Sequence, residues 1–186
     1  MRRAAALGGI AGPATFITAW AALGATKAGY SPIHDPISRL AAVDASTRWA
    51  MTGGLLALGA GVGLFARSLA EDQPGAAKAA MVTAVASVAI AVTPLESALG
   101  GNAHAAAAGL AYASLAAIPA LAGRADLAAG HRSRGRLSLT VAGASGASLL
   151  ASLVAAEHTG LWQRTGLTLG HLWIAARAVH LLRRPS

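Results

Sequence analysis

The stretch that decides the fold is AAALGGIAGPATFITAWAALGAT, residues 4–26, which follows Arg2 and Arg3. Its 23 residues include no charged side chain. An α-helix rises about 1.5 Å per residue, so about 20 residues cross the roughly 30 Å hydrocarbon core of a bilayer. The hydrophobic segment of a cleaved signal peptide has only about 7 to 15 residues. We therefore expect this stretch to remain as a first membrane-spanning helix.

Five further stretches are similar in composition and nearly as long. They are Trp49–Ala66, Ala79–Pro94, Ala103–Ala122, Leu137–Ala156 and Leu161–Leu182. Hydrophobic residues make up 55% of the 186 residues and charged residues only 12%, which leaves too little polar surface for a soluble domain of this length. We predict an all-α fold: a single domain over residues 1–186, an integral membrane bundle of six transmembrane helices.

Most of the 15 Lys and Arg residues fall in every second gap between these stretches. If six helices alternate in direction, one side carries Arg2, Arg3, Arg67, Lys78, Arg124, Arg132, Arg134, Arg136, Arg177, Arg183 and Arg184. The other side carries Lys27, Arg39, Arg48 and Arg164. Because cytoplasmic loops are enriched in Lys and Arg, this asymmetry predicts a multi-pass protein of the cell membrane with both termini in the cytoplasm.

The formal net charge of +8 does not indicate nucleic-acid binding, because the cations flank apolar stretches and are not interleaved with exposed aromatic residues. The predicted cytoplasmic cluster Arg132, Arg134 and Arg136 is explained most simply as a topology anchor. Alternatively, it contacts anionic lipid head groups, an attraction of about 1 kcal/mol per cation.

The first predicted outer loop contains its own helix signal. Asp35 and Pro36 have the order of a helix N-cap and first helical residue. Ile37, Leu40 and Ala41 then recur at helical spacing on one face. We expect a short amphipathic helix that lies along the membrane surface or caps the bundle.

Every predicted outer loop brings a carboxylate and a histidine to the same face. The candidate outer-face polar site comprises His34, Asp35, Arg39, Glu96, His104, Glu157 and Arg164. Carboxylates and imidazoles are the groups of general acid/base and metal sites. The spacing fits no metal motif and the chain has no cysteine, so we predict neither a metal nor another cofactor. Helix capping is the simpler explanation for the acids of the first loop.

The last apolar stretch places ionisable groups within the membrane. Arg164, Thr168 and His171 lie on one helical face, and His171 is near the bilayer midplane. Ionisable side chains at that depth are costly and generally face the bundle interior. The structural alternative is a neutral His171 hydrogen-bonded to a serine of the preceding helix: Ser145, Ser148 or Ser152. Arg177 and His180 are close enough to the cytoplasmic end to snorkel.

Three segments together resemble one family. They are Tyr30–Leu40 with its DPISRL sequence, Pro94-x-Glu96 followed by His104, and Gly160-Leu-Trp-Gln-Arg164 before a last helix that contains a tryptophan. In this order and spacing the chain resembles, over nearly its whole length, the family called domain of unknown function 998. The resemblance implies a six-helix integral membrane protein with no assigned activity. The family more often has Asp where Glu96 stands, and His171 is not among its typical residues.

Three functions are compatible with these features. We favour a non-enzymatic role in which the outer-face polar site and small-residue helix faces bind lipid, a partner membrane protein or a second copy. The alternative is a membrane hydrolase or transferase acting on a lipid-linked substrate at the outer face. Its acids and bases would come from His34, Glu96, His104 and Glu157, and its anion-binding groups would be Arg39 and Arg164. The third is a small proton-coupled transporter using His171, although the chain shows no evident inverted repeat.

Overall fold

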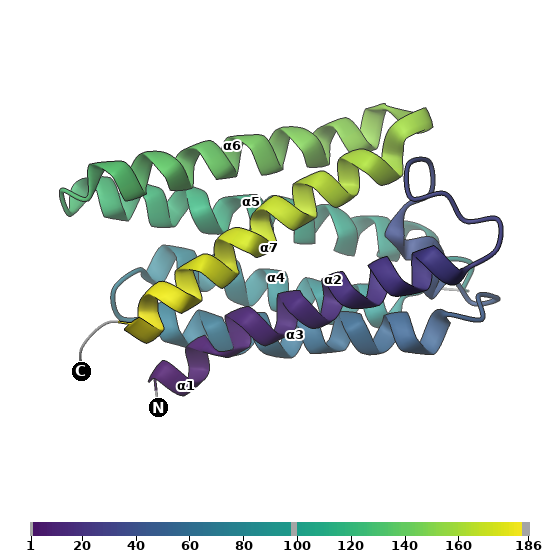
Figure 1. Cartoon of the computed structure of the whole chain (residues 1–186), viewed down its shortest axis with the longest axis horizontal. Coiled ribbons are helices and arrows are strands. Elements are labelled where there is room, and N and C mark those ends of the chain that lie inside the picture. The colour runs from purple at the N-terminus through teal and green to yellow at the C-terminus, as the bar shows by residue number, and fades with distance from the viewer. Residues whose placement is uncertain (1, 98–99, 184–186) are drawn as a thin grey trace.

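The computed structural model describes residues 2–97 and 100–183 (Figure 1). The described residues form helices and connecting loops and contain no strand, which confirms the all-α prediction. In chain order the elements are α1 (Arg2–Ala6), α2 (Gly8–Thr26), η1 (Ile37–Ala41), α3 (Arg48–Leu69), α4 (Pro74–Val92), α5 (Gly100–Ala128), α6 (Arg132–Val154), η2 (Ala156–His158) and α7 (Thr159–Arg183).

The long helices run roughly side by side along the long axis of the molecule (Figure 1). Each packs against the next in sequence from α2 to α7, and α7 also contacts α2 and α5. The α2–α3 loop, residues 27–47, lies at one end, which we call the loop end. Both ends of the described chain and the α5–α6 turn lie at the opposite end. The bundle is thereby closed by α7, which crosses between α6 and α2.

Within the described residues, five segments are long and apolar enough to cross a membrane. They are Arg3–Thr26, Arg48–Leu69, Pro74–Val92, Gly101–Ala128 and Arg132–Val154. With 25 residues, α7 has the length of a span. It is not among the five, and polar side chains such as Gln163, Arg164, His171 and Arg177 interrupt its apolar sequence. These five apolar helices indicate a membrane-embedded protein.

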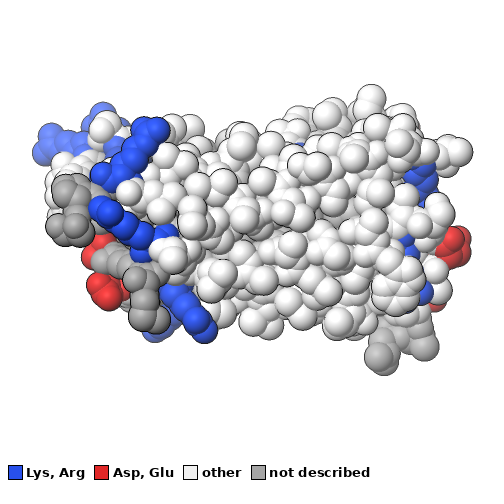
Figure 2. Space-filling view, turned by 60° about the horizontal axis from the view of Figure 1, so that its bottom comes forward, with Lys and Arg blue, Asp and Glu red and all other residues white. Residues whose placement is uncertain are grey.

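Figure 2 shows how charge is distributed along the bundle. Lys and Arg side chains gather at the two ends, with most of them at the end opposite the loop end, and a wide uncharged belt lies between. We call that end the basic end. It carries the end of α3, the start of α4, the end of α5 and the start of α6, and with these segments Arg67, Lys78, Arg124, Arg132 and Arg136. The belt exposes large apolar side chains, among them Val85 at 61% and Leu150 at 66%. An apolar belt between charged ends is the surface that a bilayer solvates.

Several helices extend beyond the predicted spans, which were drawn from apolar residues alone, whereas α4 ends at Val92 before the predicted Pro94 and α6 ends at Val154 before Ala156. α5 continues to Ala128 instead of ending at Ala122, and α6 begins at Arg132 instead of Leu137. Charged side chains near a helix end can reach the interface without interrupting the helix. Near the N-terminus, the predicted helix is divided at Leu7 into α1 and α2.

Glycines bring α2 and α3 together backbone to backbone. A Cβ atom added to Gly61 would lie 2.6 Å from the Gly12 Cα atom. In a membrane no hydrophobic effect draws helices together, so close packing of small residues supplies much of the association. These glycines therefore allow α2 and α3 to pack in direct backbone contact in the half of the pair nearer the basic end.

The segment after Asp35 forms a 3-10 helix, η1, of five residues. Ile37, Leu40 and Ala41 are buried, and η1 packs against α2, α3 and α7. Asp35 does not cap it: Pro36 occupies the N-cap position, and Asp35 Oδ2 accepts a hydrogen bond of 2.8 Å from the Ser31 backbone N–H. The prediction that Asp35 caps a helix is therefore wrong. Its carboxylate instead closes a turn within the α2–α3 loop.

Candidate functional site

The α2–α3 loop is fastened to the start of α7 by Arg164. Arg164 Nη1 donates to the backbone oxygens of Pro32 at 2.7 Å and Asp35 at 3.0 Å, and also to Gly160 O of its own helix at 2.9 Å. Nη2 donates to the Tyr30 hydroxyl. The planar guanidinium can satisfy several acceptors in one fixed geometry. Arg164, only 8% exposed, is thus committed to the loop backbone.

Two aromatic rings complete the surroundings of Arg164. Its Cζ lies 5.3 Å from the Trp20 ring centroid and 5.4 Å from that of Tyr30. A guanidinium over such rings gains cation–π attraction. Burial raises the pKa of Tyr30 above its usual value, although the neighbouring Arg164 charge works in the opposite direction. The neutral phenol therefore accepts from Arg164 throughout the physiological pH range.

Three further contacts hold the α2–α3 loop in place. Gln163 Oε1 accepts a hydrogen bond of 2.7 Å from the Ile37 N–H, while its Nε2 donates to the Tyr112 hydroxyl on α5. The Leu161 N–H donates to Ile33 O at 2.9 Å, and His34 Nδ1 contacts Glu157 O. The loop and η1 consequently form a fixed cover over the helices beneath.

A cavity of about 60 Å³ lies under this cover, within the bundle. Its wall is mostly apolar, with side chains such as Phe16, Met51, Leu55 and Leu115. The polar side chains that line it are Ser38, Thr83, Ser87, His104, Tyr112, Gln163 and His171. Among the described residues, no Asp, Glu, Lys or Arg contributes to the wall. The cavity therefore offers hydrogen bonds from uncharged groups.

His104 is oriented by the end of α4. It is 7% exposed, and its Nδ1 lies 2.7 Å from Thr93 O. A carbonyl oxygen can only accept, so Nδ1 carries the proton and, in the neutral ring, Nε2 carries the lone pair. His104 thus lines the cavity with a ring whose Nε2 can accept a hydrogen bond or act as a base.

His171 lies at the middle of α7 and is only 1% exposed. Its ring meets Phe16 edge to face, with the centroids 5.5 Å apart. Nδ1 is buried and has no hydrogen-bond partner within the described chain. The expected serine partners are wrong: Ser145 donates to Gly166 O and Ser152 to Leu149 O, and no hydrogen bond joins Ser148 to His171. A buried polar atom without a partner costs about 1–3 kcal/mol, and the described chain offers Nδ1 none.

The other predicted site residues do not form one cluster. Thr168 is half-buried on α7, and Asp35 pairs with Arg39 at 3.7 Å on the surface. Glu157 meets His34 only through its backbone oxygen, and its side chain is exposed. Glu96 is exposed with a φ of 69°, and no hydrogen bond or ion pair in the described chain joins it to His104, Arg39 or Arg164. The structure therefore brings His104 to the cavity and leaves both glutamates outside it.

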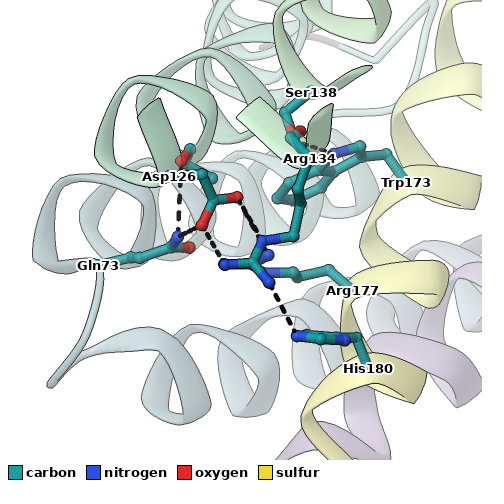
Figure 3. A network of polar contacts seen from close by, with 8 residues as sticks. Gln73, Asp126, Arg134, Ser138, Trp173, Arg177 and His180 are labelled. Atoms are coloured by element: carbon teal, nitrogen blue, oxygen red, sulfur yellow. Dashed lines mark hydrogen bonds and ion pairs between the residues drawn. The ribbon is translucent and has the colours of Figure 1, made fainter. Parts of the chain in front are cut away.

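A second polar network, which the sequence did not predict, lies toward the basic end (Figure 3). Asp126 of α5 is 3% exposed and receives both Nη atoms of Arg177 at 3.2 Å. Arg134 Nε lies 3.1 Å from Asp126 Oδ2, and Gln73 Nε2 donates to Oδ1 at 3.1 Å. His180 Nε2 in turn lies 3.3 Å from Arg134 Nη1. The interpretation of Arg177 as a snorkelling side chain is therefore wrong.

Within residues 2–97 and 100–183, no three His, Asp or Glu side chains are placed to hold one metal ion together. The polar groups that remain available are those of the cavity wall, and their chemistry is hydrogen bonding by neutral side chains.

Comparison with known proteins agrees with the motifs of the sequence. The model of a family described as "Protein of unknown function (DUF998)" matches residues 10–180. Neither the curated proteins nor the solved structures give a match. Since the matched segment covers nearly the whole chain, from α2 to the last turns of α7, the protein is a member of the DUF998 family.

Proposed function

We propose that this protein is a six-span protein of the cell membrane that binds, without catalysis, the uncharged polar end of a lipid in its central cavity. The observation that carries the proposal is His171 Nδ1, buried without a partner in a residue that lines the cavity. A ligand hydroxyl would provide the missing hydrogen bond. The loop end then faces the outside, and both termini lie in the cytoplasm.

The side chains of α7 support its role as the sixth span. Gln163, Arg164, His171 and Arg177 are all buried within the bundle. Apart from Arg183 at its end, the large side chains that α7 exposes are apolar or aromatic, for example Leu172 at 57% and Leu161 at 43%. Polar groups inside and apolar groups outside are what a lipid-facing helix requires. The orientation rests on the excess of cations at the basic end.

The cavity chemistry supports an uncharged ligand group. A charge buried beside neutral walls would lose its hydration without gaining an ion partner. A water needs about 10–15 Å³ of this kind of volume, so the 60 Å³ cavity has room for only a few atoms. It can hold a hydroxyl, ester or amide group but not a whole lipid. A monoacylglycerol, with two hydroxyls and an ester, is a suitable probe.

The outer-face polar site has a revised role in this proposal. Arg164 and Asp35 act through the loop backbone, and only His104 reaches the cavity. At the basic end, Arg132 and Arg136 are exposed, and we keep them as a proposed contact for anionic lipid. Arg134 has its Nε directed at Asp126, which makes it less suited to that role.

The proposal is tested by replacing His171 with phenylalanine, which keeps a ring beside Phe16 and removes the nitrogen atoms. The matched control is His158→Phe, in an exposed residue outside the cavity. Binding of 1-monooleoylglycerol to purified protein, measured by native mass spectrometry, should weaken about tenfold in H171F and be unchanged in H158F. Equal affinity of H171F and the unsubstituted protein would overturn the proposal.

His104 favours one second candidate, a hydrolase acting on a lipid-linked ester. Its Nδ1–H bond to Thr93 O gives Nε2 the lone pair that a general base needs. In this candidate His104→Ala abolishes ester hydrolysis while the thermal stability in detergent is nearly retained. Turnover that persists in H104A would exclude this use of His104.

A further inference from the structure

A hollow of about 270 Å³ lies between α5 and α6, separate from the central cavity. Its lining includes Gly109, Ala113, Gly146, Leu150 and Leu153 and is almost entirely apolar. Leu150 and Leu153 are each 66% exposed, so this α5–α6 groove opens onto the surface of the apolar belt. Apart from Ala116, just past the midpoint of α5, its residues belong to the half of each helix nearer the loop end.

The groove has a geometric cause in the spacing of α5 and α6. Near the α5–α6 turn, a Cβ added to Gly123 would lie 2.9 Å from Gly135 O, so the backbones are in close contact. Further along, a Cβ on Gly146 would lie 3.6 Å from Ala116 Cβ, and one on Gly109 would meet nothing within 4 Å. The two helices therefore diverge toward the loop end, and small residues keep the space between them open.

Tyr112 is common to the groove and the central cavity. It lines both, and its hydroxyl accepts the hydrogen bond from Gln163 Nε2. One side chain thus lies between a small polar-lined cavity and a larger apolar groove open to the membrane. A ligand with a polar end and an apolar chain fits this pair of spaces.

We propose that the α5–α6 groove binds the acyl chain of the lipid whose polar end occupies the central cavity, with the Tyr112 side chain between the two parts. This inference rests on the function proposed above and specifies the ligand: a single-chain neutral lipid of the outer leaflet, held through both spaces. Tyr112 lines both spaces, so a single ligand that reaches past its side chain would contact both, which favours a lipid over a second copy of the chain. The small cavity volume also requires that the rest of the ligand lie elsewhere.

The proposal is tested by substituting a larger side chain for a glycine that lines the α5–α6 groove. Gly146→Leu places an isobutyl group in it, and Gly143→Leu is the matched control one turn away, on the same helix, where an added Cβ meets nothing within 4 Å. Two probes share one head group: 1-monooleoylglycerol and 1-monobutyrylglycerol, whose chain is too short to occupy the groove. We expect G146L to weaken binding of the oleoyl probe about tenfold and to leave butyryl binding unchanged. G143L should match the unsubstituted protein with both probes.

The two probes distinguish acyl-chain binding in the α5–α6 groove from head-group binding in the central cavity. If G146L binds the oleoyl probe as G143L does, the groove proposal is overturned, whereas His171-dependent butyryl binding would still support the cavity. If G146L only converts a dimer into a monomer, the groove is an interface between copies and the proposal is also overturned. Should G146L fail to fold, Gly109→Leu is tested for the same loss, because an added Cβ at Gly109 has open space.

Discussion

Arg177 and Asp126 form a two-armed ion pair inside the bundle, with both N–O distances 3.2 Å. Arg134 approaches the same carboxylate at 3.1 Å, so one buried acid serves two cations. The pair joins α5 to α7, and Arg134 adds α6. The cluster therefore fixes the basic end of the bundle, opposite the cavity.

Because two arginines share one carboxylate, replacing the acid and replacing one arginine should have unequal effects on the stability of the protein. Asp126→Asn removes the carboxylate that Arg177 and Arg134 share, and we expect a loss of about 3 kcal/mol in the free energy of unfolding. Arg177→Gln leaves Asp126 paired with Arg134 and should cost only about 1.5 kcal/mol. Unfolding in mixed micelles measures both. Equal costs, or a larger cost for R177Q, would contradict the proposed charge balance.

Arg164→Lys tests how the α2–α3 loop is held. An ammonium group cannot satisfy three carbonyl oxygens and a phenol in the fork geometry of a guanidinium. We expect R164K to increase the rate of proteolysis within residues 27–47 severalfold while the helices remain resistant. Arg39→Gln is the control, because the Arg39 side chain is 60% exposed in its pair with Asp35 and exposed pairs contribute little. Similar proteolysis of R164K and R39Q would contradict this role.

Tyr30 predicts a loss of stability at alkaline pH. Burial raises the pKa of Tyr30 in the folded protein above its usual value of 10.0. On raising the pH the unfolded chain loses the phenolic proton first, so stability is fully present below about pH 10 and decreases as the pH rises toward the folded pKa. Tyr30→Phe should remove this part of the alkaline destabilisation, as measured by thermal unfolding across the pH range. A pH dependence that Y30F leaves unaltered would refute it.

Glycine substitutions test the divergence of α5 and α6. Gly123→Ala would place its Cβ 2.9 Å from Gly135 O and should destabilise the protein, because overpacking costs about 1–3 kcal/mol. Gly109→Ala has open space and should stabilise by up to about 1 kcal/mol through helix propensity. Thermal melting in detergent distinguishes the two. Opposite signs are expected, and a stabilised G123A would show that the helices are not in close contact there.

The sequence predicted the helices well because apolar length and charge placement are local properties. It also placed His171 inside the bundle, since position 171 is the middle of an apolar stretch. The Asp126–Arg177 pair was missed because its partners are 51 residues apart and Asp126 lies beyond the apolar stretch of α5. Spacing along one helix cannot reveal such a pairing, although a lone carboxylate one turn beyond a span is a usable signal.

The site was predicted only in part for a similar reason. The motif around Arg164 indicated an important cation, but residue types alone do not distinguish anion binding from the backbone carbonyls that Arg164 contacts. The cavity depends on side-chain volumes contributed by η1 and five long helices, α2, α3, α4, α5 and α7. The sequence pattern of a single helix does not reveal how side chains from several helices combine to form a cavity. Tyr112 and Gln163 were therefore not among the predicted residues.

The central claim is that a ligand hydroxyl meets His171 in the cavity. It is tested most directly by the nitrogen NMR signals of isotope-labelled histidine, with the His171 resonance assigned by its loss in H171F. We predict that adding 1-monooleoylglycerol shifts the His171 Nδ1 resonance in the direction of a new hydrogen bond and leaves that of the exposed His158 in place. A His171 resonance that does not move at saturating lipid would contradict the account.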